Sequence, residues 1–174
     1  MKKNSIPQTV NSYEIRTMEY NDLGRVLEIY QEGISSKIAT FQEQSDEKSW
    51  MKIHLEHSRF VLENQNDEIV GWCALKKPEN TTMYNGVAEI SIFLEKEYQG
   101  KGLGKILLEK LILDSEENGI WTLQTHLMEE NVLAIKIVEK FGFRKVGKRE
   151  KINQIDGVWK DVFLFERRSE KDFS

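Results

Sequence analysis

Hydrophobic residues recur along this chain with two different periods, which indicates a mixture of strands and helices. Apolar residues at alternate positions, or in short continuous runs, predict strands. These segments are Tyr13–Arg16, Phe60–Leu62, Ile69–Leu75, Val87–Leu94, Trp121–Leu127, Lys145–Ile152 and Val158–Phe165. Apolar residues three and four positions apart predict helices. These segments are Asn21–Ser35, Asp46–His57, Ile106–Gly119 and Asn131–Gly142.

The predicted elements form one domain of mixed α/β structure. A chain of 174 residues has the ordinary size of a single domain. No linker, internal repeat or low-complexity stretch divides the sequence. We therefore predict one domain over residues 13–168, a flexible polar tail at residues 1–12 and a second tail at residues 169–174.

Charge and composition exclude several classes of partner. The chain carries 25 basic and 29 acidic side chains, a net charge of −4, whereas proteins that bind nucleic acid usually carry a basic patch. No apolar run reaches the roughly 18 to 20 residues that span a bilayer, and the first residues lack the apolar core of a signal peptide. The single cysteine, Cys73, cannot form an internal disulfide. We therefore expect a cytoplasmic protein that binds neither nucleic acid nor membrane.

The densest glycine cluster lies between a predicted strand and a predicted helix. It reads Gln99-Gly100-Lys101-Gly102-Leu103-Gly104-Lys105. Glycines let the backbone turn sharply and bring its N–H groups close to a ligand. The free amides and the dipole at a helix N-terminus favour phosphate, and the two lysines add positive charge. The pattern predicts an anion site, and the alternative is a tight strand-to-helix turn that binds nothing.

Two well-known phosphate loops do not match this cluster. A Walker loop has four residues between its first glycine and Gly-Lys, followed by Ser or Thr. Here three residues separate Gly100 from Gly104, and Ile106 follows Lys105. The dinucleotide fingerprint GxGxxG has a third glycine where this chain has Lys105. The spacing therefore disfavours a nucleoside triphosphatase and a dinucleotide-binding enzyme.

The same cluster resembles the acetyl-CoA motif of the GCN5-related N-acetyltransferase (GNAT) superfamily, Gln/Arg-x-x-Gly-x-Gly/Ala, at every position from Gln99 to Gly104. The resemblance covers Ile15–Arg167, and within the superfamily it looks most like the phosphinothricin and L-amino-acid N-acetyltransferases. The segments that carry this narrower likeness are Ile29-Tyr30, Ala39-Thr40-Phe41, Tyr84, Glu89-Ile90-Ser91-Ile92-Phe93, Asn131, Gly142-Phe143 and Gly157–Asp161 with Trp159.

The resemblance implies a fold, a reaction and an assembly. The implied fold is a single mixed, mostly antiparallel sheet of about six to seven strands, flanked by about four helices, with splayed central strands. The implied reaction transfers an acetyl group from acetyl-CoA to a primary amine, without a metal, by direct attack in a ternary complex. Because members of this group often dimerise, the resemblance also suggests a homodimer.

The resemblance further implies which residues bind the cofactor. The pyrophosphate would lie on the loop from Gln99 through Lys105. The pantetheine arm would pair with the backbone of Ile92, Phe93 and Leu94. Asn131 would contact the cofactor from the start of the next helix.

Acetyl transfer to an amine requires a proton acceptor, because an amine is mostly ammonium at neutral pH. Glu89, on the strand before the glycine loop, is the candidate base, acting directly or through water. The alternative is a carboxylate that faces solvent or a neighbouring lysine. We expect backbone N–H donors of the same strand, at Phe93, to stabilise the charge that develops on the acetyl oxygen.

The sequence also departs from the family pattern. Many relatives have a tyrosine, and the phosphinothricin group a histidine, where this chain has Val138, and Ala134 replaces a serine. The usual general acid on that helix is therefore missing, and water or the substrate ammonium is expected to protonate the leaving thiolate. Glu79-Asn80-Thr81-Thr82 replaces arginines suited to a substrate anion, for which Lys76 or Lys77 could substitute as point charges.

Other residues allow a chemical and a structural interpretation. Phe41, Trp72 and Tyr84 are candidates for the wall of the amine pocket, and core packing is the alternative for each. His54 and His57 have a spacing that can bind a metal. Without other ligands in the sequence, a solvated helix face is the preferred interpretation.

The sequence thus predicts an acetyl-CoA-dependent N-acetyltransferase. Its acceptor would be the primary amine of a small molecule, an amino acid or a toxic analogue resembling phosphinothricin. One alternative is a protein or peptide N-acetyltransferase. The other is a non-catalytic acyl-CoA-binding module.

Overall fold

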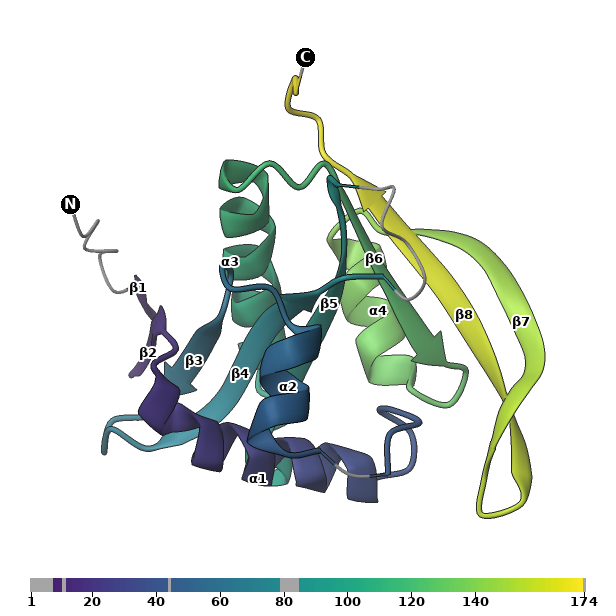
Figure 1. Ribbon diagram of the computed structural model, residues 1–174, viewed down its shortest axis with the longest axis horizontal. Coiled ribbons are helices and arrows are strands. Elements are labelled where there is room, and N and C mark those ends of the chain that lie inside the picture. The colour runs from purple at the N-terminus through teal and green to yellow at the C-terminus, as the bar shows by residue number, and fades with distance from the viewer. Residues whose placement is uncertain (1–7, 11, 44, 79–84, 174) are drawn as a thin grey trace.

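The computed structural model describes residues 8–10, 12–43, 45–78 and 85–173 (Figure 1). The strands are β1 (Gln8–Val10), β2 (Tyr13–Thr17), β3 (Phe60–Glu63), β4 (Ile69–Lys76), β5 (Val87–Leu94), β6 (Thr122–Met128), β7 (Arg144–Ile155) and β8 (Val158–Arg168). The α-helices are α1 (Leu23–Ser35), α2 (Glu47–Ile53), α3 (Leu103–Glu117) and α4 (Val132–Lys140). Two short 3₁₀ turns are η1 (Tyr20–Asp22) and η2 (Lys96–Tyr98).

Within the described ranges, the strands form one eight-stranded sheet in the order β1-β2-β3-β4-β5-β6-β8-β7. Neighbouring strands are antiparallel, except for β5 and β6, which are parallel. The three-residue β1 pairs with β2 at one edge, inside the segment that we had expected to be a tail. The other seven strands and the four helices confirm the predicted mixed, mostly antiparallel sheet.

The parallel pair β5–β6 is joined over only part of its length. Its register partners are Val87 with Thr122, Ala88 with Leu123 and Glu89 with Gln124. In the described strands the pairing ends there, although β5 continues to Leu94 and β6 to Met128. The two central strands therefore separate after Glu89 and Gln124, as the expected splay requires. We call this point the split.

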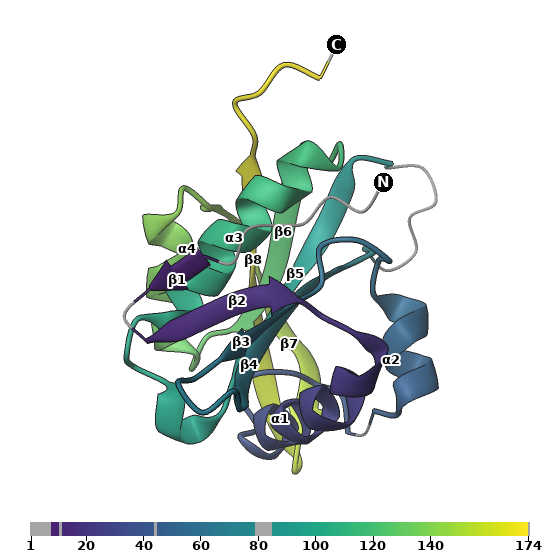
Figure 2. The ribbon, with the colours of Figure 1, turned by 90° about the vertical axis from the view of Figure 1, so that its left-hand side faces the viewer.

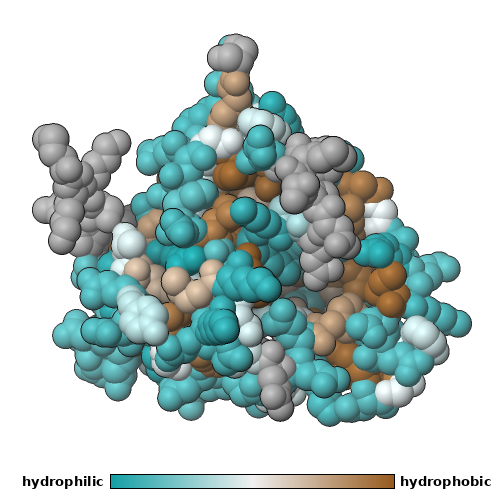
Figure 3. All heavy atoms as spheres, viewed as in Figure 1, coloured by the Kyte–Doolittle hydropathy of each residue, from teal (hydrophilic) through white to brown (hydrophobic). Residues whose placement is uncertain are grey.

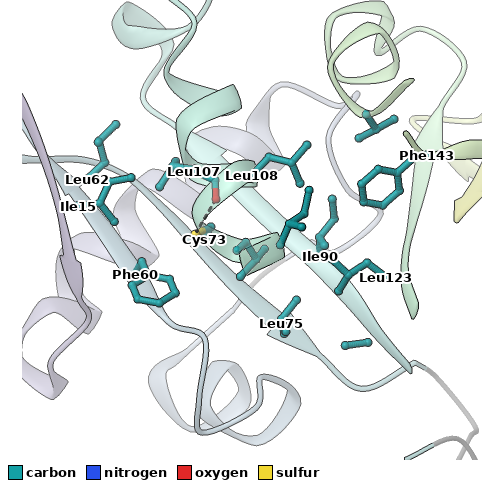
Figure 4. Close-up of a cluster of buried hydrophobic side chains, with 14 of the residues drawn as sticks. Ile15, Phe60, Leu62, Cys73, Leu75, Ile90, Leu107, Leu108, Leu123 and Phe143 are labelled. Atoms are coloured by element: carbon teal, nitrogen blue, oxygen red, sulfur yellow. Dashed lines mark hydrogen bonds between the residues drawn. The ribbon is translucent and has the colours of Figure 1, made fainter. Parts of the chain in front are cut away.

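Helices cover both faces of the sheet (Figure 2). On one face, leucines of α3 pack on apolar side chains of β3, β4 and β5. Figure 4 shows Cys73 among them, where its thiol donates to the carbonyl of Leu107 at 3.6 Å. Burial raises the pKa of the Cys73 thiol, so this cysteine is an inert part of the core.

On the opposite face, α1 and α2 pack on the sheet through an aromatic cluster. Trp50 of α2 and Trp72 of β4 are fully buried, with ring centroids 5.5 Å apart. Trp72 stacks on Phe93 of β5 at 5.0 Å, and Tyr30 of α1 meets Phe93 edge to face at 4.7 Å. This cluster attaches the two helices to β4 and to β5, and β5 borders the split.

His54 belongs to the aromatic cluster, and the expectation that it lies on a solvated helix face was wrong. The helix α2 ends at Ile53, so His54 lies outside the helix. Its backbone forms an isolated antiparallel β-bridge with Lys76 of β4. Its ring is stacked on Trp50, Nδ1–H donates to the Trp50 carbonyl at 2.8 Å, and Nε2 accepts from the Ser91 hydroxyl at 3.3 Å. Burial lowers the pKa of His54 from 6.5 to about 4, which keeps the ring neutral at neutral pH.

The surface is mostly hydrophilic, with hydrophobic atoms exposed in several places, including the hairpin formed by β7 and β8. No helix in the described part of the chain combines the length and apolar character needed to cross a membrane. Figure 3 shows hydrophobic atoms gathered over the hairpin, on the right of the view. The exposed apolar side chains of the hairpin are Val146, Ile152, Val158 and Trp159.

We predict that Gly33→Ala destabilises the protein. A Cβ atom at Gly33 would stand 2.5 Å from Cδ1 of Phe93, so the ring would have to move within a packed cluster. The free energy of unfolding should fall by about 1 to 3 kcal/mol, measured by urea denaturation. Gly24→Ala in the same helix is the matched control, because no atom of the described ranges lies within 4 Å of a Cβ there. Equal stability of the two variants would contradict the close packing of Phe93.

We also predict that stability falls as the pH drops from 6.5 toward about 4. In this range the unfolded chain takes up a proton at His54, whereas the folded chain does not, so protonation favours unfolding. The shift in pKa corresponds to at most about 3 kcal/mol. Urea denaturation at about pH 7.5, 6 and 5 measures the slope, which should be smaller in His54→Phe because phenylalanine does not titrate. An unchanged slope in this variant would assign the effect to other groups.

Candidate active site

Glu89 is the last residue of β5 that pairs with β6, so it lies beside the split. It is only 8% exposed. Both of its carboxylate oxygens have a cationic or imidazole partner. Lys76 of β4, its register partner, places Nζ 2.9 Å from Oε1. His126 of β6 places Nδ1 3.4 Å from Oε2. The carboxylate is therefore held from the strands on both sides.

Two opposing effects set the protonation state of Glu89. Burial alone would raise the pKa of the carboxyl. The hydrogen bond from His126 and the positive charge of Lys76 outweigh burial and lower the pKa below its usual value. Glu89 is therefore an anion at neutral pH, and it faces a lysine as one of the two sequence interpretations expected.

Side chains on β5 alternate between the two faces of the sheet. Glu89, Ser91 and Phe93 share one face, as the sequence pattern predicted. Ser91 contacts His54, and Phe93 packs in the aromatic cluster. This face of β5, between α2 and the split, carries the polar groups that could act on an acceptor.

Backbone groups on β5 alternate in direction too, and two hydrogen bonds fix the alternation. The carbonyl of Gly86 accepts from the N–H of Thr122, so the backbone of Gly86 faces β6. The N–H of Glu95 donates to the carbonyl of Val70, so the backbone of Glu95 faces β4. Even-numbered residues of β5 therefore direct their N–H and C=O groups toward β6, and odd-numbered residues direct theirs toward β4.

This alternation changes the assignment of the backbone donors. Beyond the split, Ile92 and Leu94 direct their backbone groups toward the space between the strands. Phe93 is the register partner of Trp72, so its N–H faces β4 and is used in the antiparallel ladder. The expected oxyanion donor at Phe93 is therefore wrong, and Ile92 and Leu94 carry the amides that face the split.

The glycine loop lies between η2 and α3, with the geometry of an anion cradle. Gly100 and Gly102 have φ angles of 73° and 83°, values that favour glycine. No atom of the described residues lies within 4 Å of a Cβ at either position, so in this part of the chain nothing covers the loop. Gly102 is the N-cap of α3 and supplies no side chain to its first amides. The loop therefore leaves the positive end of α3 free for an anionic group.

Side chains around the loop position it and add charge. Gln99 donates from Nε2 to the carbonyl of Leu94 at 3.1 Å, which ties the loop to the end of β5. Lys101 lies over the ring of Tyr98 at 4.9 Å, and Lys105 is half-buried in the first turn of α3. The open amides at the start of α3 and the two lysines are donors and positive charges that suit a diphosphate.

The two predicted positions on α4 have structural roles. Asn131 is the N-cap of the helix, and its Oδ1 accepts from the N–H of Ala134 at 3.3 Å. Val138 is buried against α3 and the sheet, so this position brings no proton donor. The missing general acid is thus an apolar core residue.

The three predicted wall residues have different outcomes. Trp72 is fully buried in the aromatic cluster, so it packs in the core beneath the site and does not line a pocket. Phe41 is half-buried in the segment between α1 and α2. Tyr84 lies outside the described residues, and so does the segment 79–82 that replaces the family's arginines.

The structure adds polar residues that the sequence analysis did not place at the site. His126 had no predicted role, and Lys76 was considered only as a contact for the substrate. Gln124 and His126 stand two positions apart on β6, which places them on one face of the sheet. That spacing was the available signal, but only the register between β5 and β6 brings His126 to Glu89. In the described residues, no three His, Cys, Asp or Glu side chains gather to hold a metal ion.

Comparisons with known proteins agree with this geometry. The sequence model of the Acetyltransferase (GNAT) family matches residues 25–143. A Bacillus subtilis protein named "Putative phosphinothricin acetyltransferase YwnH" is 28% identical over 88% of this chain and 97% of its own length. The L-methionine sulfoximine/L-methionine sulfone acetyltransferase of Pseudomonas aeruginosa is 23% identical over 87% of this chain and 91% of its own.

A solved structure shows the same fold. It is a GNAT superfamily phosphinothricin acetyltransferase from Sinorhizobium meliloti in complex with AcCoA, with a TM-score of 0.80 and 24% identity. The match covers 90% of this chain and 88% of that one. The family model spans more than half of the sequence, including β5 and the glycine loop. The chain therefore belongs to the Acetyltransferase (GNAT) family.

Proposed function

We propose that this protein transfers the acetyl group of acetyl-CoA to the α-amine of a small amino acid or amino-acid analogue, by direct attack in a ternary complex. The observation that carries the proposal is the ion pair between the buried Glu89 and the half-buried Lys76, whose oxygen and nitrogen lie 2.9 Å apart at the split. It combines with a free anion cradle at the N-terminus of α3.

The cofactor site is supported by two features of the chain. The amides at the N-terminus of α3, with Lys101 and Lys105, suit the pyrophosphate of acetyl-CoA. The backbone groups of Ile92 and Leu94 suit an extended pantetheine arm, since they face the space between the strands. The similar Sinorhizobium meliloti protein contains AcCoA, which agrees with this assignment. When bound, the cofactor supplies the thioester.

The acceptor class follows from the adjacent opposite charges of Glu89 and Lys76. An α-amino acid carries an ammonium and a carboxylate on one carbon, so the two groups can lie beside a carboxylate and a lysine that are in contact. An amine without a carboxylate would leave Lys76 without a partner from the substrate. The proposal agrees with the relative that acts on L-methionine sulfoximine and L-methionine sulfone.

The chemistry requires removal of a proton and stabilisation of an oxyanion. Glu89 is the anionic end of the proton path and acts directly or through a neighbouring group. The N–H of Ile92 or Leu94 donates to the acetyl oxygen as negative charge develops there. These donors are in place before the reaction, because the strand holds them.

The first test combines an amine panel with Glu89→Gln. CoA release should be fastest with L-methionine sulfone, L-methionine sulfoximine or phosphinothricin, and much slower with the same side chains on amines that lack the α-carboxylate. Glu89→Gln should lower kcat by about 100-fold or more near neutral pH, because the variant removes the anionic group from the proton path. Calorimetry should show unchanged affinity for acetyl-CoA. Glu109→Gln, an exposed position on α3, is the matched control.

Other outcomes of the same assay contradict the proposal. Turnover of peptides but not of amino acids would favour a protein or peptide N-acetyltransferase. Tight binding of acetyl-CoA without turnover of any amine would favour an acyl-CoA-binding module. Full activity of Glu89→Gln would refute the role of Glu89.

A second test addresses the cradle. We predict that Gly102→Asp weakens the affinity for acetyl-CoA by at least about tenfold, because it places a negative charge at the positive end of α3. Calorimetric titration with acetyl-CoA measures the change. Gly119→Asp is the matched control, since Gly119 also has a positive φ, of 78°, and open space, at the other end of α3. Equal affinities of the two variants would place the phosphate site elsewhere.

A further inference from the structure

Glu89 is poorly placed to take a proton from an acceptor by itself. Its side chain is 10% exposed, and each oxygen already has a partner, Lys76 on one side and His126 on the other. Burial and these two partners leave little of the carboxylate open to a substrate ammonium. The carboxylate is therefore placed to hold its two neighbours, one of which is the imidazole ring of His126.

His126 is the more accessible member of the pair. Its side chain is 31% exposed, three times the value for Glu89. It lies on β6 two residues beyond Gln124, which is the last residue of β6 that pairs with β5. His126 therefore lies where the two strands have begun to separate. Nδ1 faces Glu89, and among the described residues no partner is assigned to Nε2.

The groups around His126 come from three neighbouring strands. Glu89 contacts it from β5, and Lys76 of β4 is paired with the far oxygen of that carboxylate. On β8, Leu164 lies opposite His126, and Glu166 lies opposite Gln124. Glu166 is paired with Arg144 of β7 at 2.8 Å, so its charge is already compensated.

His54 lies on the face of the sheet that α1 and α2 cover. His54, after α2, is directed to Ser91 and not to His126, and it is neutral at neutral pH. Glu89 is therefore the one carboxylate in contact with His126 among the described residues. A carboxylate on Nδ1 fixes the tautomer in which Nε2 carries the lone pair.

We propose that His126 is the catalytic base of the reaction and that Glu89 orients its imidazole ring. This inference rests on the proposed acetyl transfer to an amine. Nε2 of His126 takes a proton from the substrate ammonium, and the freed nitrogen forms a bond to the acetyl carbon. The carbon–sulfur bond then breaks with its electron pair on sulfur.

The same group can complete the proton balance. The imidazolium returns its proton to the thiolate, and the second proton on the new amide nitrogen leaves to solvent. The products are the N-acetyl compound, CoA with its thiol protonated, and one proton. This route needs no acid on α4, where Val138 is buried and apolar.

The test compares His126→Gln and His126→Ala with the wild-type protein over a range of pH. Both variants should lose about 100-fold or more in kcat/KM with an amino-acid acceptor, and calorimetry should show unchanged affinity for acetyl-CoA. The acidic limb of the pH profile of kcat/KM should move to higher pH, because without the base only the free-amine form of the substrate can attack. Added imidazole should restore turnover in His126→Ala, and more basic imidazoles should restore more, which a structural role would not produce.

A matched control and the wild-type protein make the result decisive. His57→Gln removes a histidine that follows α2 and has no role in the proposed site. This variant should leave kcat/KM and the pH profile unchanged. If His126→Gln keeps near wild-type turnover and the same pH profile while Glu89→Gln is inactive, then Glu89 is itself the base and the inference is wrong. If the wild-type protein acetylates no amine, the proposed function fails, and the inference fails with it.

Discussion

The separation of β5 from β6 after Glu89 and Gln124 is the constraint on which the rest of this structure depends. A parallel pair that stayed joined would use every backbone group that faces it. Because pairing ends at the third position, Ile92 and Leu94 keep backbone groups directed into the space between the strands. Neighbouring residues of β5 therefore differ in what they present. The even-numbered residues direct backbone N–H and C=O groups into this space, whereas Glu89, Ser91 and Phe93 direct their side chains to the face covered by α1 and α2.

The charges at the split are arranged to keep a buried carboxylate ionised. Burying a lone carboxylate is strongly unfavourable, and its pKa would rise until it became neutral. Lys76 and His126 prevent this from the two flanking strands, so the pKa of Glu89 falls despite burial. Such a buried pair contributes little net stability, since desolvation offsets much of the attraction. Its value lies in a fixed negative charge beside a partly exposed imidazole, a combination that suits proton transfer more than folding.

The sequence predicted most of the fold because its signals are local. Val87–Leu94 has the predicted bounds, and the glycine loop lies at the predicted junction with α3, since alternation and glycine spacing are read over a few residues. The failures involve relations between distant segments. His54 looked like a solvated helical residue because nothing local shows that α2 ends at Ile53 and turns into the sheet. The amide of Phe93 was assigned to the wrong side because backbone direction depends on which strand each residue pairs with, and His126 reaches Glu89 only through the register of β5 and β6.

The positions on α4 show how a site can move within an unchanged fold. Asn131 uses its side-chain carbonyl oxygen to cap the helix, and Val138, where the family pattern has a polar residue, contributes to the core, so both residues have structural roles. A general acid at Val138 would have to be polar in a closely packed layer, where an unpaired polar group is unfavourable. His126 avoids that conflict because it stands on a strand, at the edge of the split, with a carboxylate on one nitrogen and the other open. Proton transfer in this protein is therefore best understood as a property of the sheet, where the geometry that separates the strands also creates the place for the base.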